Sequence, residues 1–366
     1  MDGFKGYMAK LPAIVAKSLQ RLPEVAFVEQ DQIVTLLETQ TNPPSWGLKR
    51  ITSRELPLPA NYNYPDTAGE NVDAYIIDTG VLITHKEFQG RAKVGKSFSD
   101  DNNDRDGNGH GTHVAGTVGG QTFGVAKKVN IIAVKVLNGQ GSGTNSDVIA
   151  GIEWVGTNAP KTGRKSVANM SLGGGASAAL DAAVRAVINN GVAMAVAAGN
   201  SAGDACKLSP ARVKEALTVA ASDKYDKLAS FSERGKCVDI IAPGVDITSS
   251  WNNGKDNTIS GTSMASPHAC GVLALAYGQR DFASVKEAND YVVAIGSRKA
   301  VSGVPKGTPN ILLYNDVTID APEPNPEDPD EPEDPDPEEP GDNVCPFPKC
   351  LIDPSCTACC FEGVDC

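Results

Sequence analysis

The stretch VDAYIIDTGV, residues 72–81, is the part of this 366-residue chain that most directly predicts its fold. Its apolar run is nearly unbroken, which is typical of a strand buried on both faces of a parallel sheet. The run ends in Asp78, so a carboxylate stands at the carboxyl end of a core strand. Because burial of an unpaired charge is costly, Asp78 requires a partner such as a histidine ring N–H, unless it only caps a turn.

Further apolar runs follow along the chain, separated by segments with helical spacing. Helices are predicted over residues 146–159 and 176–191, the second with Gly191 at its C-terminal cap. This alternation predicts an α/β fold, a doubly wound, mainly parallel sheet flanked by helices. Sites in such sheets form at the carboxyl ends of the strands. The other predicted strands are residues 129–137, 166–172, 192–198, 216–221 and 238–243.

Composition divides the chain into four segments. In the first segment, residues 1–40, the spacing of apolar residues predicts a helix over residues 13–22 and a strand over residues 24–34, which together would form a small, partial α+β domain. The second holds the alternating strands and helices. The third alternates proline with acid, which is typical of a stiff, solvated spacer. The fourth is a small six-cysteine module. The four segments are residues 1–40, 41–318, 319–343 and 344–366.

Charge and hydropathy exclude two classes of partner. The formal net charge is −12, and the twelve acidic residues between Asp320 and Asp342 account for all of it. The rest of the chain is therefore formally neutral, and nothing on it favours nucleic-acid binding. No apolar run approaches the roughly 20 residues that span a bilayer. We therefore expect no membrane helix.

Cysteine usage indicates an oxidising compartment. Six of the nine cysteines lie within residues 345–366, a density typical of disulfide-stapled modules in secreted proteins. A stapled adhesion module, a zinc site and a removable extension all remain possible there, with the first favoured because no histidine is present. The opening MDGFKGYMAK lacks the pattern of a signal peptide. We expect a secreted protein whose start is truncated in this chain, in preference to unconventional export.

Four histidines limit the search for a catalytic base, and two of them lie in DRDGNGHGTHVAGTVGG, residues 104–120. His110 and His113 are three apart, whereas the zinc motif of metalloproteases needs histidines four apart and a glutamate. The zinc motif is therefore excluded. Taken alone, the pair is more readily structural than catalytic, although His110 could be a general base.

The stretch SGTSMASPHACG, residues 260–271, opens a predicted buried helix near Thr262. Free backbone N–H groups and the helix dipole near Ser263 suit the stabilisation of an oxyanion. His268 follows five residues later, roughly 140° around the helix axis, so it does not share a face with Ser263. Ser263 is either a nucleophile or a helix cap, and its position alone does not decide between them.

The combination of these motifs is specific. Asp78, His110 and Ser263 follow in that order within DTG, HGTHVAG and GTSMASPH, which resembles the subtilase family of serine proteases, in its proteinase K branch. An α/β-hydrolase would place its serine first, in a G-x-S-x-G elbow, and is excluded by GTSMA. The resemblance covers nearly all of residues 41–318. Other matching stretches are QTNPPSWGL, EFQGRA, FGVAKKVNI, KVLNGQGSGT, NMSLGGG, AVAAGNS and SFSERG.

The resemblance implies a monomeric serine endopeptidase. Ser263 would be the nucleophile, His110 the general base and then acid, and Asp78 the group that orients the imidazole. Asn200 would supply a side-chain N–H to the oxyanion hole, beside the backbone N–H of Ser263.

Protein or peptide substrates would bind as an added strand between two segments of the enzyme. The primary pocket would be small and uncharged, so large apolar or aromatic residues before the scissile bond are expected. The two segments are Gly141, Ser142 and Gly143 on one side and Ser171, Leu172 and Gly173 on the other, and the pocket residues are Ala197, Ala198 and Gly199.

The resemblance also makes residues 1–40 the second half of an inhibitory propeptide, cut by the enzyme near Leu37 to Gln40. It implies a disulfide between Cys206 and Cys237 and leaves Cys270 as a buried thiol. A structural Ca²⁺ would be held by the Asp239 side chain and by the main-chain oxygens of Lys214 and Ala216. No cofactor is needed for the chemistry. We expect the acid-rich loop 99–109 to be solvated, in preference to holding a second ion.

Two other function classes fit part of the sequence. In one, the protein is an adhesion factor whose tail is active and whose protease domain is vestigial. In the other, it is an intracellular processing enzyme with reduced tail cysteines. The complete set of Asp78, His110, Ser263 and Asn200 favours the peptidase.

Overall fold

The apolar runs lie in one sheet, ordered β14-β15-β11-β10-β8-β6-β3-β5-β4 in the part of the chain that the structure describes. The structure is a computed structural model that describes residues 11–25, 28, 37–101 and 103–317. Every neighbouring pair is parallel except β14 with β15. The strands are β3 (Val72–Asp78), β4 (Ala92–Ser97), β5 (Asn130–Lys135), β6 (Lys165–Met170), β8 (Val192–Ala197), β10 (Leu217–Ser222), β11 (Ile240–Pro243), β14 (Ser297–Arg298) and β15 (Ile311–Leu312).

Burial explains which strands the sequence predicts. Every residue of β3, β8 and β10 is buried, as expected for strands covered on both faces. β4 was not predicted, because this edge strand alternates between half-buried and exposed residues and has no apolar run. Three short pairs lie outside the main sheet: β1 (Leu37–Thr41) with β2 (Asn61–Pro65), β7 (Gly174–Gly175) with β9 (Leu208–Ser209), and β12 (Ile247–Ser250) with β13 (Asp256–Ile259).

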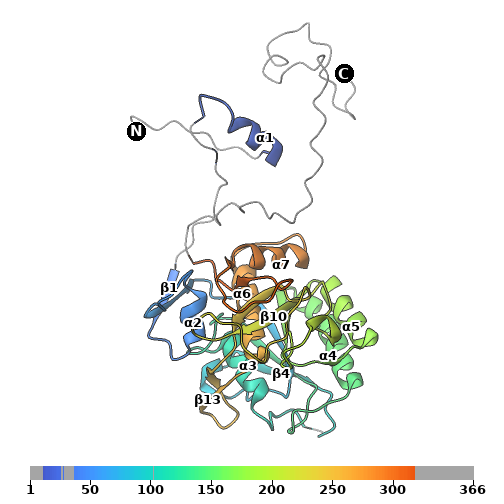
Figure 1. Ribbon diagram of the computed structural model, residues 1–366. Helices are drawn as coiled ribbons and strands as arrows, with labels where there is room; N and C mark the ends of the chain where they lie inside the picture. Colours follow the sequence, from blue (N-terminus) through green and yellow to red (C-terminus); the bar gives the residue numbers. More distant parts are fainter. Residues whose placement is uncertain (1–10, 26–27, 29–36, 102, 318–366) are drawn as a thin grey trace. The chain divides into compact units, whose positions relative to one another are not determined.

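Helices cover both faces of the sheet (Figure 1). α3 packs with α6 on one face, and α4 packs with α5 on the other. α5 ends as predicted, with Gly191 in the left-handed region at φ +88° just after the C-cap. The helices are α1 (Ala13–Leu19), α2 (Trp46–Ile51), α3 (His110–Gly119), α4 (Asn145–Asn158), α5 (Ala178–Asn189), α6 (Thr262–Gln279) and α7 (Val285–Ala294), with 3-10 turns η1 (Lys86–Phe88), η2 (Ala159–Thr162) and η3 (Ala205–Lys207).

The strand order reverses at β3, which lies between β5 and β6. After β5 the chain crosses back over β3 to β6 and continues in the opposite direction through β8, β10 and β11. Such a reversal leaves a crevice at the carboxyl end of the central strand. Asp78 is the last residue of β3, so it lies at this crevice. The prediction of a doubly wound, mainly parallel sheet is confirmed.

Several predictions concern residues outside the described part. They are most of the strand over residues 24–34, the acidic segment 319–343 and the cysteine module 344–366. The predicted cut near Leu37 to Gln40 falls within β1. Among the residues that are described, no helix has the length and apolar character needed to cross a membrane.

Candidate active site

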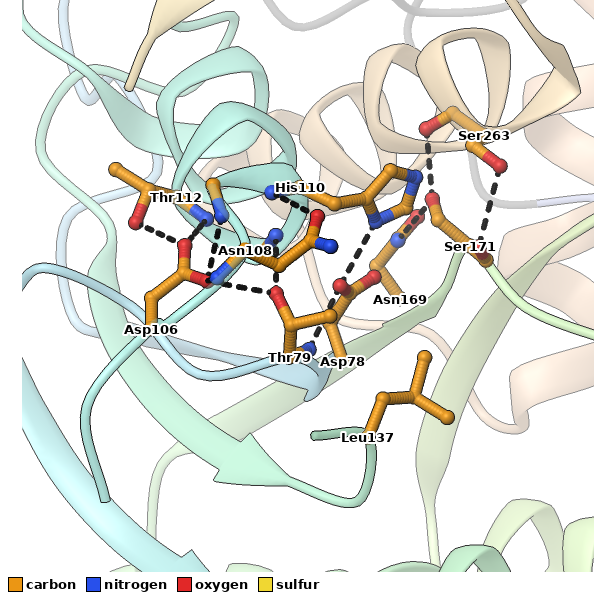
Figure 2. Close-up of polar contacts among 12 residues, drawn as sticks. Asp78, Thr79, Asp106, Asn108, His110, Thr112, Leu137, Asn169, Ser171 and Ser263 are labelled. Atoms are coloured by element: carbon orange, nitrogen blue, oxygen red, sulfur yellow. Dashed lines mark hydrogen bonds and ion pairs between the residues drawn. The ribbon is translucent and has the colours of Figure 1, made fainter. Parts of the chain in front are cut away.

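Asp78 contacts His110, the first residue of α3 (Figure 2). His110 Nδ1 lies 2.8 Å from Asp78 Oδ1. An ionised carboxylate only accepts hydrogen bonds, so Nδ1 donates, and Nε2 of the neutral ring keeps its lone pair. Burial by itself would lower the pKa of His110. The charge and hydrogen bond of Asp78, together with the charge of Asp106, outweigh this effect, so the pKa lies above its usual value.

Asp106 holds the first turn of α3 in place. The N-cap residue is Gly109, which has no side chain to cap the free N–H groups. Asp106 replaces it and accepts five hydrogen bonds, from Asn108 N, Gly109 N, Thr112 N, Thr112 Oγ1 and Thr79 Oγ1. At 8% exposure it is a buried residue in the loop 99–109, in which the acidic residues Asp100 and Asp104 are exposed. Sequence reasoning missed Asp106, and the glycine N-cap was the signal that an outside acceptor was needed.

Gly111 allows α3 to approach β3 closely. A Cβ atom at this position would overlap the carbonyl oxygen of Gly80 and would lie 3.2 Å from Asp78 Oδ1. The backbone N–H of Gly111 donates to Thr79 Oγ1 at 2.9 Å. The glycine in HGTH therefore serves the contact between Asp78 and His110.

Ser263 is the second residue of α6, and the N-cap is Gly261. The interpretation of Ser263 as a helix cap is therefore wrong. Its hydroxyl donates to the carbonyl oxygen of Ser171 at 3.1 Å, and within the described residues no hydrogen bond joins it to His110. Catalytic hydrogen bonds are often long or poorly aligned before substrate binds and tighten in the complex. Figure 2 shows the Ser263 hydroxyl directed to Ser171.

Asn200 takes over the capping of α6. Its Oδ1 accepts from Thr262 N at 2.8 Å and from Thr262 Oγ1 at 2.9 Å. With the oxygen engaged in this way, the NH₂ group remains as the donor. A Cβ atom on Gly261 would lie 3.6 Å from both Asn200 Nδ2 and Ser263 N, so the two donors border one small space that Gly261 keeps open.

An open cleft of about 430 Å³ joins His110 to both predicted substrate segments. Ala197 and Ala198 are buried at the end of β8, and neither they nor Gly199 line this cleft. The lining side chains include no aspartate, glutamate, lysine or arginine. They are Thr79, Asn108, His110, Leu137, Gly141, Ser142, Gly143, Asn145, Val148, Ser171, Leu172, Gly173, Gly174 and Leu180.

The other histidines bind main-chain oxygens. His113 Nε2 lies 2.9 Å from Ile247 O and His268 Nδ1 lies 2.8 Å from Met264 O. Burial lowers the pKa of each to about 4, so both rings are neutral at physiological pH. Burial also raises the pKa of the Cys270 thiol, which agrees with an inert core residue.

Cys206 and Cys237 form the predicted disulfide, with a Cα–Cα distance of 5.3 Å. The predicted calcium ligands border a second cavity, of about 720 Å³, which Lys214, Ala216 and Asp239 all line. Asp239 Oδ2 accepts from Thr218 N at 2.7 Å, and burial raises the pKa of Asp239 to about 7. No cluster of three or more metal-ligating side chains occurs among the described residues. A carboxylate with main-chain oxygens nevertheless fits a hard cation such as Ca²⁺.

Comparisons with known proteins agree with the fold. Residues 69–305 match the Subtilase family, and residues 1–37 match the Peptidase inhibitor I9 family. These matches define a serine protease with an inhibitor domain at its N-terminus. The chain belongs to the subtilase family.

Individual relatives support this membership. Proteinase T of Parengyodontium album is 50% identical over 293 residues, which cover 79% of this chain and 98% of that protein. Subtilisin-like serine protease Pen ch 18 of Penicillium rubens is 44% identical over 335 residues, covering 85% of this chain and 67% of that protein. The crystal structure of a cold adapted subtilisin-like serine proteinase matches with a TM-score of 0.70 at 50% identity, over 74% of this chain and 97% of that one.

Proposed function

We propose that this protein is a secreted endopeptidase that cleaves peptide bonds through an acyl-enzyme on Ser263. The observation that carries the proposal is the 2.8 Å contact between Asp78 and His110 beside a cleft that both predicted substrate segments line. Ser263 donates a hydrogen bond to Ser171, one of the residues that line this cleft. The disulfide between Cys206 and Cys237 supports secretion.

The triad acts in two stages. Ser263 Oγ bonds to the carbonyl carbon of the scissile peptide while its proton passes to His110 Nε2, and Asp78 stabilises the imidazolium. The C–N bond then breaks, the leaving amine takes the proton from His110, and the acyl group stays on Oγ. Water attacks this ester with His110 again as base, and the carboxylic acid leaves as the Ser263 hydroxyl is restored.

The oxyanion of each tetrahedral intermediate would lie between Asn200 Nδ2 and Ser263 N. Both donors border the space beside Gly261, and Thr262 holds the Asn200 amide in the orientation that presents its NH₂ group. Preorganised donors of this kind stabilise charge that develops only in the transition state.

An extended substrate would pair with the segments Gly141–Gly143 and Ser171–Gly173 by main-chain hydrogen bonds. No aspartate, glutamate, lysine or arginine lines the cleft, which supports a broad preference for apolar or aromatic residues. The assignment of Ala197, Ala198 and Gly199 to the primary pocket stays a prediction.

Residues 1–40 would inhibit the peptidase until the enzyme cuts them off near Leu37 to Gln40, and the match of residues 1–37 to an inhibitor family supports this role. A structural Ca²⁺ would bind Asp239 and the main-chain oxygens of Lys214 and Ala216, which line one cavity. When bound, the ion would neutralise the buried carboxylate and tie together two loops, without a part in the chemistry.

The test compares the wild-type chain with Ser263→Ala. We expect the wild type to cut itself near residue 40 and to react with a fluorophosphonate at Ser263, and the variant to do neither. Peptide p-nitroanilides ending in phenylalanine or leucine should be cleaved faster than those ending in arginine or glutamate. A folded wild-type protein that neither processes itself nor reacts with the fluorophosphonate would contradict the proposal and favour a vestigial protease domain.

A further inference from the structure

A proline interrupts the main-chain hydrogen bonding of α6 at the carbonyl group of Ser263, the proposed nucleophile. Pro267 lies inside α6, four residues after Ser263. In an α-helix the carbonyl of a residue accepts from the N–H four positions later, but proline has no N–H and its ring crowds that carbonyl. The main-chain carbonyl of Ser263 therefore lacks its usual helical donor.

A side chain from another segment takes the place of that donor. Ser171 Oγ donates to the Ser263 carbonyl oxygen at 2.7 Å, and Figure 2 shows this contact together with the reverse one from Ser263 Oγ to the Ser171 carbonyl. Two hydrogen bonds thus join Ser171 and Ser263, which are 92 residues apart in the chain. Ser171 follows directly after β6, the strand next to β3.

The hydroxyl of Ser171 is itself oriented by buried neighbours. Asn169 Nδ2 donates to Ser171 Oγ at 2.8 Å, and Ser266 Oγ donates to Asn169 Oδ1 at 2.6 Å. Asn169 and Ser266 are fully buried. Because the Ser266 hydroxyl donates to the Asn169 amide oxygen, the Asn169 NH₂ group faces Ser171 Oγ. The hydroxyl proton of Ser171 is then directed to the Ser263 carbonyl oxygen. The chain of bonds begins and ends on α6.

We propose, resting on the catalytic roles given above, that Ser171 is a positioning residue for the nucleophile: its hydroxyl, oriented by Asn169 and Ser266, holds the Ser263 carbonyl that Pro267 leaves without a donor. This bond fixes the backbone of Ser263, and with it both Oγ and the N–H that faces the oxyanion. The Ser171 carbonyl, which accepts from Ser263 Oγ in this structure, is a separate group from this hydroxyl.

A double-mutant cycle tests the link between Ser171 and Pro267. Ser171→Ala removes the substitute donor, and Pro267→Ala restores the helical N–H. The acylation rate constant is measured by stopped flow with a p-nitrophenyl ester, together with KM and the thermal midpoint. In the wild-type background we expect Ser171→Ala to slow acylation about tenfold with KM changed less than about twofold. In the Pro267→Ala background the same change should slow acylation less than about threefold.

Two further variants keep the test decisive. Ser266→Ala should slow acylation in the same direction as Ser171→Ala but less, since it acts through Asn169. Ser166→Ala, at the opposite end of β6, is the matched control and should leave acylation unchanged. If Pro267→Ala does not fold, the acylation rate constants of Ser266→Ala and Ser166→Ala, compared with that of Ser171→Ala, test the positioning role.

The positioning role would be overturned if Ser171→Ala lowered the acylation rate constant equally in the wild-type and Pro267→Ala backgrounds. It would also be overturned if the Ser171→Ala enzyme were acylated at the wild-type rate. A purely structural role would lower the thermal midpoint without changing the acylation rate constant of the folded enzyme. Failure of the proposed function would look different, because the wild type itself would not be acylated at Ser263.

Discussion

Asp78 and His110, 32 residues apart in the chain, are joined by a 2.8 Å hydrogen bond at the carboxyl end of the central strand β3. The Asp78 carboxylate is fully buried. Its charge and its hydrogen bond raise the pKa of His110, although burial acts in the opposite direction. His113, the next histidine on the same helix, is neutral because burial lowers its pKa to about 4. Of these two histidines of α3, His110 therefore becomes protonated at the higher pH.

We expect Asp78→Asn to lower turnover about 10⁴-fold, because the wrong imidazole tautomer then faces Ser263. Activity requires neutral His110, so it is lost as the pH falls through the His110 pKa. Without the Asp78 charge that pKa falls, and the acid limb of the kcat/KM profile should move to lower pH. The pH dependence of kcat/KM with a peptide substrate measures this shift, and an acid limb that stays in place would contradict it.

The same pair affects stability with a defined sign. The pKa of His110 is higher in the folded protein than in the unfolded chain, so the pair stabilises the fold fully below the unfolded value. This contribution is lost as the pH rises through the folded value.

Asn200→Asp separates the two roles of Asn200. The substitution keeps an oxygen that can cap Thr262 but replaces the NH₂ donor, so kcat should fall at least 10²-fold with little change in KM. Gly261→Ala places a methyl group 3.6 Å from both donors and should also lower kcat. Steady-state kinetics measures both, and a loss confined to KM would argue against the oxyanion role.

The segment of residues 141–143 should tolerate little change. A Cβ atom at Gly143 would overlap the carbonyl oxygen of Val136, so Gly143→Ala must shift the segment and should lower kcat/KM about tenfold, mainly through KM. Gly175 is the matched control, since it does not line the cleft and a Cβ there meets nothing within 4 Å. Peptide kinetics compares the two, and equal effects would sink the assignment of this segment to substrate binding.

Replacement of both Cys206 and Cys237 by serine should lower the free energy of unfolding by about 3.7 kcal/mol on the chain-entropy estimate, given a separation of 31 residues. Urea unfolding with and without reductant measures this. Reductant should destabilise the wild type and Cys270→Ala alike, but not the double variant. A Cys270→Ala protein that no longer responds to reductant would contradict the pairing.

Removal of calcium with a chelator should lower the thermal midpoint of the wild type. Asp239→Asn should have a lower midpoint from the start and show no further response, because the single carboxylate ligand is gone. Asp290 lines the same cavity and pairs with Lys286, so Asp290→Asn should still respond. Scanning calorimetry decides, and an unchanged wild-type midpoint after chelation would exclude a structural ion.

Local pattern was sufficient for the buried strands of the main sheet and for the order of the catalytic motifs. Buried strands such as β3 and β8 are apolar throughout, and helix caps follow from single residues such as Gly191. Buried strands and helix caps depend on residues that are close in the sequence, so they can be predicted without knowledge of the tertiary structure. The edge strand β4 lacked such a pattern because three of its six residues are exposed and none is fully buried.

Tertiary structure alone decided which polar groups meet. The sequence by itself determined that Asp78 ends a core strand and that Ser263 opens a helix. It did not determine that Asp106 caps α3, that Asn200 caps α6 from 62 residues away, or that Ser171 holds the carbonyl left free by Pro267. Hydrogen bonds between distant segments follow from strand order, which places β6 beside β3 although β4 and β5 come between them in the chain. No local periodicity encodes that order.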